Sequence, residues 1–295
     1  MSDLDLRLVS LSPEDGARCA TLGRFGGWET EPRRWATMLG VGQGWGALVR
    51  DALVGVVIVN RFGPSPEDER PGGERQDVLP SLASVAMMMV DPGYRRRGVA
   101  QALLERALES VQGAPVFLLA SAMGRPLYAG LGFEERGQSE RWTGTPALPP
   151  EEHPGLRPLR GADRAAVVAL DAAAQGAPRT ALLDAVLAGA DRAFVVERQG
   201  ELVAFGLSAP VEGFRQVGPM VAEDDRDAVA LASRLSFGCT LPLKLDLPVG
   251  ETVLAEWARA AGLSIATTST FMVRGANPLP GRRAWVRAYA GRAYG

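Results

Sequence analysis

Apolar and polar residues alternate at the start of the chain and then change to helical spacing. Leu4 to Leu8 alternates apolar with charged side chains, which predicts a strand with one buried face. Ser12-Pro13-Glu14-Asp15 follows, and a helix is predicted from there to about Gly23, because serine caps helices and proline suits their first position. A second helix is predicted to start in Trp28-Glu29-Thr30-Glu31-Pro32 and to run to about Leu39.

A hairpin is predicted next, followed by a long polar loop. The glycine-rich segment 40–46 precedes a strand rather than a helix, so we interpret it as a flexible entry to a strand at 47–50. A turn at 51–52 and a strand over 53–61 complete the hairpin. Residues 63–80 are rich in proline, glycine and charge, which indicates a mobile loop and a candidate substrate lid.

The most informative stretch is a buried strand, a basic loop and a helix in succession. Ser84 to Val90 is apolar and stops at Asp91-Pro92-Gly93, which predicts a strand that ends in a turn. Gln101 to Leu108 has apolar residues at helical spacing. The loop between them, Arg95 to Ala100, therefore leads straight into a helix N-terminus.

That loop has the composition of an anion-binding site. Unpaired N–H groups and the macrodipole make a helix N-terminus attractive to anions. Gly98 has no Cβ and lets a phosphate approach the main chain, while the neighbouring arginines neutralise it. A diphosphate fits this arrangement. The alternative is an ordinary turn whose arginines are only solvated.

The remaining pattern completes one unit and then repeats it. A strand at 116–120, a helix from Ser121 that stops at Gly132, and a strand at 134–143 are predicted first. After a proline-rich linker the same order of elements returns, which implies duplicated domains. The repeated elements are predicted at 156–159, 163–173, 178–188, 193–197, 202–209, 216–222, 224–235, 243–247, 252–261 and 263–274.

Composition narrows the function classes. With 46% hydrophobic and 22% charged residues and a net charge of −2, the chain is typical of a soluble globular protein and gives no reason to expect a nucleic-acid partner. Cys19 and Cys239 are far apart and His153 is the single histidine, so we expect no disulfide framework, no metal site and no histidine catalysis. No signal peptide or membrane span is predicted, which makes the cytoplasm the default location.

Two motifs resemble signatures of the GNAT superfamily of N-acetyltransferases. Residues Met88 to Ala100 match its acyl-CoA-binding pattern, and Pro126 to Phe133 matches its second signature. Neither a P-loop nor a dinucleotide-binding glycine motif is present. The resemblance implies an α/β fold of the α+β mixed-sheet type and acetyl-CoA as co-substrate. The cofactor-binding residues that it implies are Met88, Met89, Val90, Arg95, Arg96, Arg97, Gly98, Val99, Ala100 and Ser121.

The same resemblance suggests part of the catalytic machinery. Tyr128 would lie near the CoA sulfur and protonate the departing thiolate, a contribution of typically about 10²–10⁴ in rate; the alternative is that it only packs in the core. Ser84 to Met89 lacks the strand carboxylate that many members use as a base. Glu29, Glu31, Glu74 and Asp77 are weaker candidates, and Trp28, Trp35 and Trp45 either line the acceptor side or pack.

The second half is predicted to be unfit for CoA. Aligning Val221 with Val90 places Val229 on Gly98 and Leu231 on Ala100, so both small positions become bulky. Aligning Gly262 with Gly132 places Ala258 on Tyr128, and acidic residues at 223–225 and 227 repel a diphosphate. This layout resembles bacterial tandem-GNAT proteins with a degenerate C-terminal half. Residues 278–295 are predicted to add an edge strand.

The predicted organisation is therefore a catalytic GNAT domain at 1–148, a linker at 149–155, a degenerate GNAT-like domain at 156–276 and a C-terminal strand or tail at 277–295. The predicted activity is transfer of an acetyl group from acetyl-CoA to a primary amine of a small molecule by direct attack, without metal. Two alternatives remain: a non-catalytic CoA-binding, sensing or scaffold protein, and an enzyme acting on a protein N-terminus or lysine. We expect a monomer or homodimer and no membrane or nucleic-acid partner.

Overall fold

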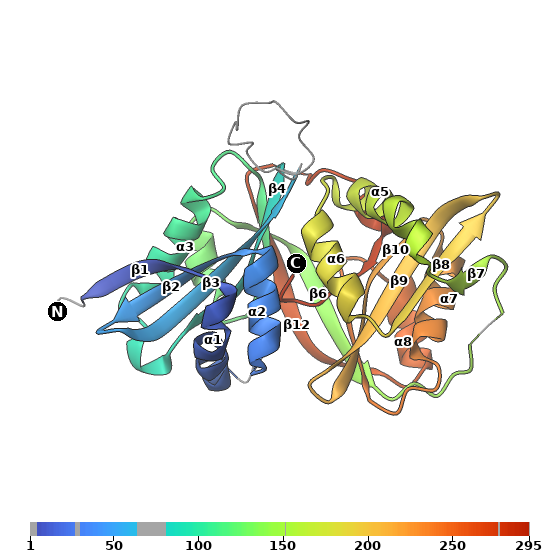
Figure 1. Cartoon of the computed structure of the whole chain (residues 1–295), viewed down its shortest axis with the longest axis horizontal. Helices are drawn as coiled ribbons and strands as arrows, with labels where there is room; N and C mark the ends of the chain where they lie inside the picture. The colour runs from blue at the N-terminus through green and yellow to red at the C-terminus, as the bar shows by residue number, and fades with distance from the viewer. Residues whose placement is uncertain (1–4, 27–29, 64–80, 151, 277, 295) are drawn as a thin grey trace.

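The computed structural model describes residues 5–26, 30–63, 81–150, 152–276 and 278–294. Two similarly built halves lie side by side and share one mixed sheet (Figure 1). This is the α/β fold of two tandem units that the sequence predicts. Within the described parts of the chain, no helix has the length and apolar character needed to span a membrane.

The first half begins with an antiparallel meander that helices cover on both faces. Helices α1 and α2 pack on one face and α3 on the other, because the strand residues between them are apolar on both sides. The elements are β1 (Leu6–Leu11), α1 (Gly16–Gly23), α2 (Pro32–Val41), β2 (Gln43–Val49), β3 (Ala52–Phe62), β4 (Leu82–Val90), α3 (Val99–Glu109), β5 (Val116–Ala120), α4 (Arg125–Gly130) and β6 (Glu134–Gly144).

Two local predictions meet different outcomes here. The Ser12 backbone N–H donates to the Asp15 carboxylate at 3.0 Å at the start of a short 3₁₀ turn, and α1 follows directly, as the capping residues predict. The glycine-rich segment 40–46 is not a flexible entry. Gly44 and Gly46 lie within β2, where an added Cβ would meet Leu39 or Leu11 side chains at 2.3 and 2.8 Å. Glycine is therefore used for close packing.

The second half repeats this order. Its elements are β7 (Leu156–Pro158), α5 (Arg164–Gln175), α6 (Thr180–Gly189), β8 (Arg192–Arg198), β9 (Glu201–Val211), β10 (Phe214–Ala222), α7 (Asp225–Ser236), β11 (Leu243–Leu247), α8 (Val253–Ala260), β12 (Ser264–Arg274) and β13 (Val286–Ala288). By position and pairing, β10, α7, β11 and α8 are the counterparts of β4, α3, β5 and α4.

The last strands of the two halves are exchanged. Strand β12 pairs with β5 and β6, and β6 in turn pairs with β12 and β11, so the order across the centre is β5-β12-β6-β11. Each half thus ends in a strand that completes the sheet of the other, as the crossing of β6 and β12 in Figure 1 shows. The sequence predicted both strands but not their exchange.

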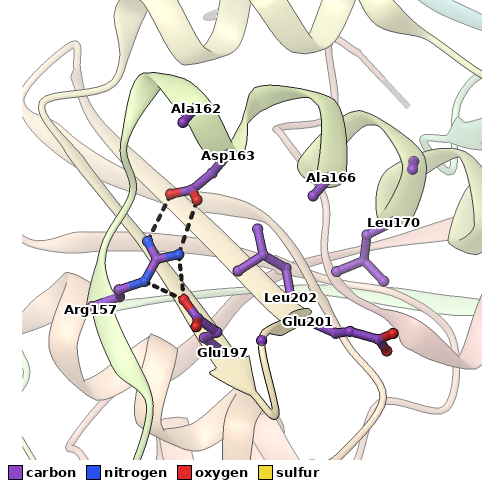
Figure 2. A pocket seen from close by; sticks show the side chains of 10 residues that line it. Arg157, Ala162, Asp163, Ala166, Leu170, Glu197, Glu201 and Leu202 are labelled. Atoms are coloured by element: carbon purple, nitrogen blue, oxygen red, sulfur yellow. Dashed lines mark hydrogen bonds and ion pairs between the residues drawn. The ribbon is translucent and has the colours of Figure 1, made fainter.

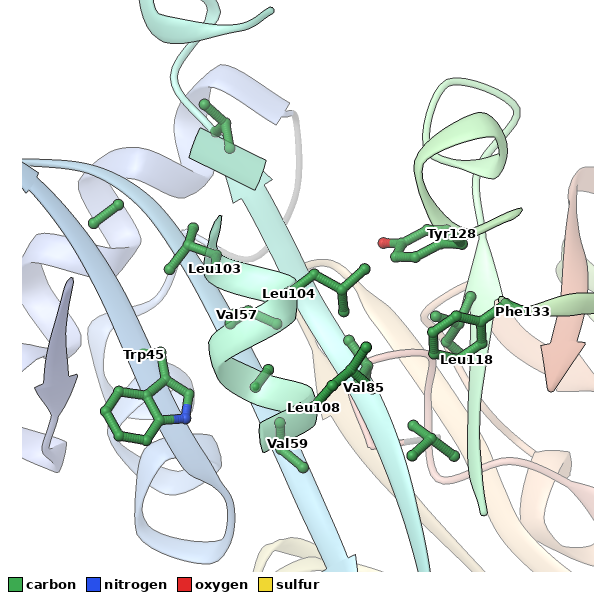
Figure 3. Close-up of a cluster of buried hydrophobic side chains, with 14 of the residues drawn as sticks. Trp45, Val57, Val59, Val85, Leu103, Leu104, Leu108, Leu118, Tyr128 and Phe133 are labelled. Carbon is green, nitrogen blue, oxygen red and sulfur yellow. The ribbon is translucent and has the colours of Figure 1, made fainter. Parts of the chain in front are cut away.

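Two apolar cores in the first half hold the site in place. On the α3 face, Leu103, Leu104 and Leu108 pack against β3, β4 and β5, and this core also contains Tyr128 and Phe133 (Figure 3). On the α1–α2 face, a second core includes Trp35 together with Ala290 and Tyr294 from the C-terminal segment. The end of the second half is therefore part of the core of the first.

Candidate functional site

The first half has an opening in its sheet between β4 and β5. These strands pair in parallel only from Ala83 to Val85, although β4 continues to Val90. On its other edge, β4 stays paired with β3, and a β-bulge there leaves Met87 with a φ of 53°. Among the described residues, the β5-facing main chain of Met88, Met89 and Val90 has no strand partner. An extended ligand that contains amide groups could form hydrogen bonds to this free strand edge.

The basic loop presents a row of unpaired N–H groups. The first helical hydrogen bond of α3 runs from the Ala102 N–H to the Gly98 carbonyl at 3.0 Å. No described residue accepts a hydrogen bond from the N–H groups of Gly98, Val99, Ala100 or Gln101. Unpaired N–H groups are the condition that anion binding at a helix N-terminus requires, and the binding itself stays a prediction.

Gly98 is favoured at this point by its backbone conformation. It is the N-cap of α3 and has a φ of +83°, a left-handed conformation that glycine adopts without strain. A Cβ built on it meets no atom within 4 Å, so the space in front of its main chain is open.

The three arginines of the loop are exposed around this terminus. Only Arg95 is anchored, because its Nε donates to the Val90 carbonyl at 3.2 Å. The guanidinium carbon of Arg97 lies 5.8 Å from the centre of the Tyr94 ring. None of the three forms an ion pair with a described carboxylate. Their charge is thus available to an anionic ligand.

Tyr128 points its hydroxyl at this opening from the opposite side. Its ring is buried and packs edge-on against Phe133, with ring centres 5.9 Å apart. The hydroxyl makes no hydrogen bond to a described residue and is not among the buried polar atoms that lack a partner, so it reaches solvent. Figure 3 shows it directed toward Leu104 of α3. Burial raises the pKa of Tyr128 to about 12, which keeps its proton in place at neutral pH.

Ser121 lies at the entry to α4, where it shapes the backbone. Its Oγ accepts from the Gly124 N–H at 3.2 Å and its carbonyl accepts from the N–H groups of Gly124 and Arg125. Ser121 is exposed between the end of β5 and Tyr128. Its contact with a cofactor stays a prediction.

The structure separates the other residues considered for the acceptor side. Glu31 is exposed at the start of α2, whereas Glu29, Glu74, Asp77 and Trp28 lie outside the described residues. Trp35 packs in the core on the α1–α2 face. Trp45 packs on the α3 face, with Arg106 stacked at 4.2 Å from its ring centre. These two tryptophans therefore contribute packing rather than lining one surface together.

The corresponding opening in the second half is filled by the chain itself. Strands β10 and β11 pair in parallel only at 215–217, just as β4 and β5 do. Strand β13 then enters between them: Val286 and Ala288 pair with the end of β10, and the Tyr289 N–H donates to the Asp246 carbonyl at 2.9 Å. This segment, 286–289, occupies the place that the described residues leave open in the first half, so the strand in 278–295 is an inserted strand and the prediction of an edge strand was wrong.

Arg287 of this segment also occupies the approach to helix α7. Its guanidinium donates to the carbonyls of Ala222 and Glu223 at 3.0 and 3.1 Å, and it forms ion pairs with Asp225 and Glu251 at 2.8 and 3.1 Å. A small pocket of about 240 Å³ remains beside it. An internal cation thus lies where the first half is open to an anion.

Aligning the two halves at a nearly constant offset gave the wrong counterpart of Gly98 at the loop but the right counterpart of Tyr128 at α4. Helix α7 begins at Asp225 with Asp224 as N-cap, so Val229 lies inside the helix and is not the counterpart of Gly98. The second half lacks the basic loop altogether. By contrast, Leu263 N–H donates to the Ala258 carbonyl as Phe133 N–H does to that of Tyr128, so Ala258 is the counterpart of Tyr128.

A larger pocket of the second half lies away from this region. It has a volume of about 470 Å³ and lies between α5 and the β8–β9 hairpin (Figure 2). Its one cation, Arg157, is held by Asp163 at 2.7 Å and by Glu197 at 2.7 Å. The Arg157 hydrogen bonds lower the pKa of Asp163 to about 2, so this group of charges is already satisfied.

Comparison with known proteins decides the family. Residues 41–135 and 167–288 each match a family model described as an acetyltransferase (GNAT) domain. The chain belongs to the GNAT acetyltransferase family. The matches cover most of the chain and fall one in each half, so this GNAT protein is a tandem one. It is thereby an acyltransferase by family, and GNAT domains generally use acetyl-CoA as co-substrate.

Individual relatives agree with this assignment. The chain is 26% identical over 179 residues to the uncharacterized N-acetyltransferase YitH of Bacillus subtilis (strain 168), an alignment that covers 59% of this chain and 64% of that one. A putative acetyltransferase from Pyrococcus horikoshii has a TM-score of 0.78 at 18% identity, covering 100% of this chain and 98% of its own. A tandem GNAT protein from the clavulanic acid biosynthesis pathway has a TM-score of 0.60 at 16% identity, covering 93% and 99%. The two structures show the shared fold.

Proposed function

We propose that the first half of this GNAT protein transfers an acetyl group from acetyl-CoA to a primary amine of a small molecule. The observation that carries the proposal is the contrast between the two halves. The opening between β4 and β5 is free and faces a basic helix N-terminus, whereas the equivalent opening between β10 and β11 is filled by residues 286–289. Among the described residues, this opening is filled by the chain in the second half and is left unfilled in the first, which supports a co-substrate site in the first half.

The residues of the first half would divide the binding of acetyl-CoA between them. The free edge of Met88 to Val90 would pair with the amide-bearing arm. The N–H groups around Gly98 and the guanidinium groups of Arg95 to Arg97 would bind the diphosphate. Acetyl-CoA supplies a thioester whose carbonyl carbon is open to attack. No group of three or more potential metal ligands occurs among the described residues.

Tyr128 would act when the carbon–sulfur bond breaks. The amine nitrogen forms its bond to the carbonyl carbon and loses a proton to solvent or to a base, and the sulfur leaves with the electron pair of the broken bond. The Tyr128 hydroxyl, still protonated because its pKa is about 12, donates its proton to that sulfur. A hydroxyl that reaches solvent from a buried ring is positioned for this donation.

The test is Tyr128→Phe, with Tyr289→Phe as the matched control. Both tyrosine rings are buried and both have a pKa raised to about 12, but only Tyr128 borders the opening. We expect Tyr128→Phe to lower turnover by roughly 10² or more with CoA affinity unchanged, and Tyr289→Phe to leave turnover unchanged. If the parent protein binds CoA but acetylates no amine in a broad panel, the protein is a CoA-binding protein without this activity.

A further inference from the structure

A cluster of charged side chains lies where the exchanged strands meet, on the sheet face that carries α1 and α2. At its centre is Asp246 of β11, which is fully buried. Arg141 of β6 donates from Nε and Nη2 to the two carboxylate oxygens at 2.7 and 2.8 Å. Arg292 of the C-terminal segment places its Nε 3.2 Å from the same carboxylate. Two arginines thus share one aspartate.

Lys244 adds a third cation to this cluster. It lies two residues before Asp246 in β11 and therefore on the same face. Its ammonium lies 4.4 Å from the centre of the Phe214 ring and forms no ion pair with a described residue. Burial, and then the charge of Arg141, lower the pKa of Lys244. Three cations consequently depend on a single carboxylate.

The neighbouring charges do not correct this imbalance. Arg34 of α2 and Glu212 of the β9–β10 hairpin also act on Lys244, but with opposite signs, and Glu212 accepts hydrogen bonds from Thr30 at 2.8 and 3.0 Å. Burial also lowers the pKa of Arg292. Three partly buried cations that face one carboxylate leave an excess of positive charge, so an anion that reached them would be bound.

The cluster lies beside the opening of the first half. The last residue of β5, Ala120, pairs with Thr270 of β12, and β12 continues past this point without β5 as a neighbour. Arg292 Nη2 donates to the carbonyl of Thr267 in that continuation at 3.1 Å. At about 4.8 Å per strand, Arg141 on β6 and Lys244 on β11 lie roughly 10 and 14 Å sideways from the line of β5. Solvent reaches Arg141 and Arg292, whose side chains are 23% and 19% exposed.

We propose that Arg141, Lys244 and Arg292 bind an anionic group of the acceptor, which is therefore an amine that carries a carboxylate or phosphate at its far end. This inference rests on the proposed acetyl transfer in the first half. The side on which α3 and the basic loop lie is taken by acetyl-CoA, so the acceptor approaches from the other face, where the cluster lies. A separation of roughly 10–14 Å corresponds to three or four extended residues.

The experiment compares acceptors that differ only in that charge. Trialanine and its C-terminal amide have the same amine and the same length, and 8-aminooctyl phosphate places a phosphate at a similar reach of about 12 Å from its amine. We expect kcat/KM for trialanine to exceed that for the amide by about tenfold or more, because charge-assisted hydrogen bonds are involved. Lys244→Met should remove this preference and Lys244→Arg should keep it. A preference for the phosphate would assign the site to phosphorylated amines.

A second measurement separates this inference from the proposed function. Trialanine should raise the Tm of the wild type and not that of Lys244→Met, whether or not acetyl transfer occurs. Equal kcat/KM for acid and amide, or a Tm shift that Lys244→Met retains, overturns the anion site while leaving acetyl transfer standing. Absence of CoA binding and of turnover, together with an acid-specific Tm shift, overturns the proposed function and leaves the anion site standing.

Discussion

Replacing Gly98 by aspartate and by asparagine tests the diphosphate site directly. Both residues tolerate the left-handed backbone that Gly98 adopts at φ +83°, and a Cβ there meets no atom within 4 Å. The two variants have nearly the same shape and differ by one negative charge. Any difference in their CoA affinity therefore reports electrostatics rather than backbone strain.

The size of the effect follows from the geometry of the loop. A carboxylate at this N-cap would lie about 5 Å from a bound phosphate, where two unit charges repel by roughly 1 kcal/mol in water and roughly 3 kcal/mol at an effective dielectric of about 20. We expect Gly98→Asp to bind CoA roughly 4-fold to 200-fold more weakly than Gly98→Asn. The difference should shrink as salt is raised, because the site is exposed.

Isothermal titration calorimetry with CoA measures both variants, and circular dichroism confirms that they are folded. If both folded variants bind CoA as tightly as the parent protein at low salt, the assignment of the diphosphate to this helix N-terminus is refuted. A large loss in both variants with no difference between them would instead indicate that the loop conformation matters and the charge does not.

Two further predictions concern the ion pairs of Arg287 in the second half and the stability of the protein at alkaline pH. Arg287→Met should lower the free energy of unfolding by about 3 kcal/mol, because it leaves the buried carboxylate of Glu251 without its ion-pair partner; denaturant unfolding measures this loss. CoA binding by the first half should stay unchanged, which calorimetry measures. Tyr128 and Tyr289 have pKa values raised to about 12 by burial, so the folded state holds their protons more firmly than the unfolded chain does. Stability from these groups is complete below pH 10 and is lost as pH rises toward 12, with a slope of up to about 1.4 kcal/mol per pH unit for each; Tyr289→Phe should reduce that slope in pH-dependent unfolding.

The local features of the site could be predicted from the sequence because they depend on neighbouring residues. The run from Ser84 to Leu108 contains residues that end a strand, a glycine, and apolar residues at helical spacing. Each of these features determines the conformation of the backbone at its own position. The same holds for the helix of Tyr128 and its stop at Gly132, which has a φ of +84°. Local sequence therefore predicted the loop between β4 and α3 and the two helices α3 and α4.

The long-range features could not be predicted in this way. Nothing in the sequences of β6 and β12 indicates whether the neighbour of each strand comes from the same half. The entry of Val286 to Tyr289 between β10 and β11 depends on where the chain goes after 276, and Arg287 resembled any surface arginine. An ungapped alignment also could not reveal that α7 starts almost directly after β10.

The exchange of β6 and β12 makes the folding of each half depend on a strand from the other. A cut between β6 and β7 would leave β5 and β6 of the first fragment with no strand between them, and would expose two unpaired sheet edges that favour aggregation. The second half is thus part of the structure of the first and could not be removed without unpairing these strands. Whatever else the second half does, it supplies the strand that lies between β5 and β6 of the first half.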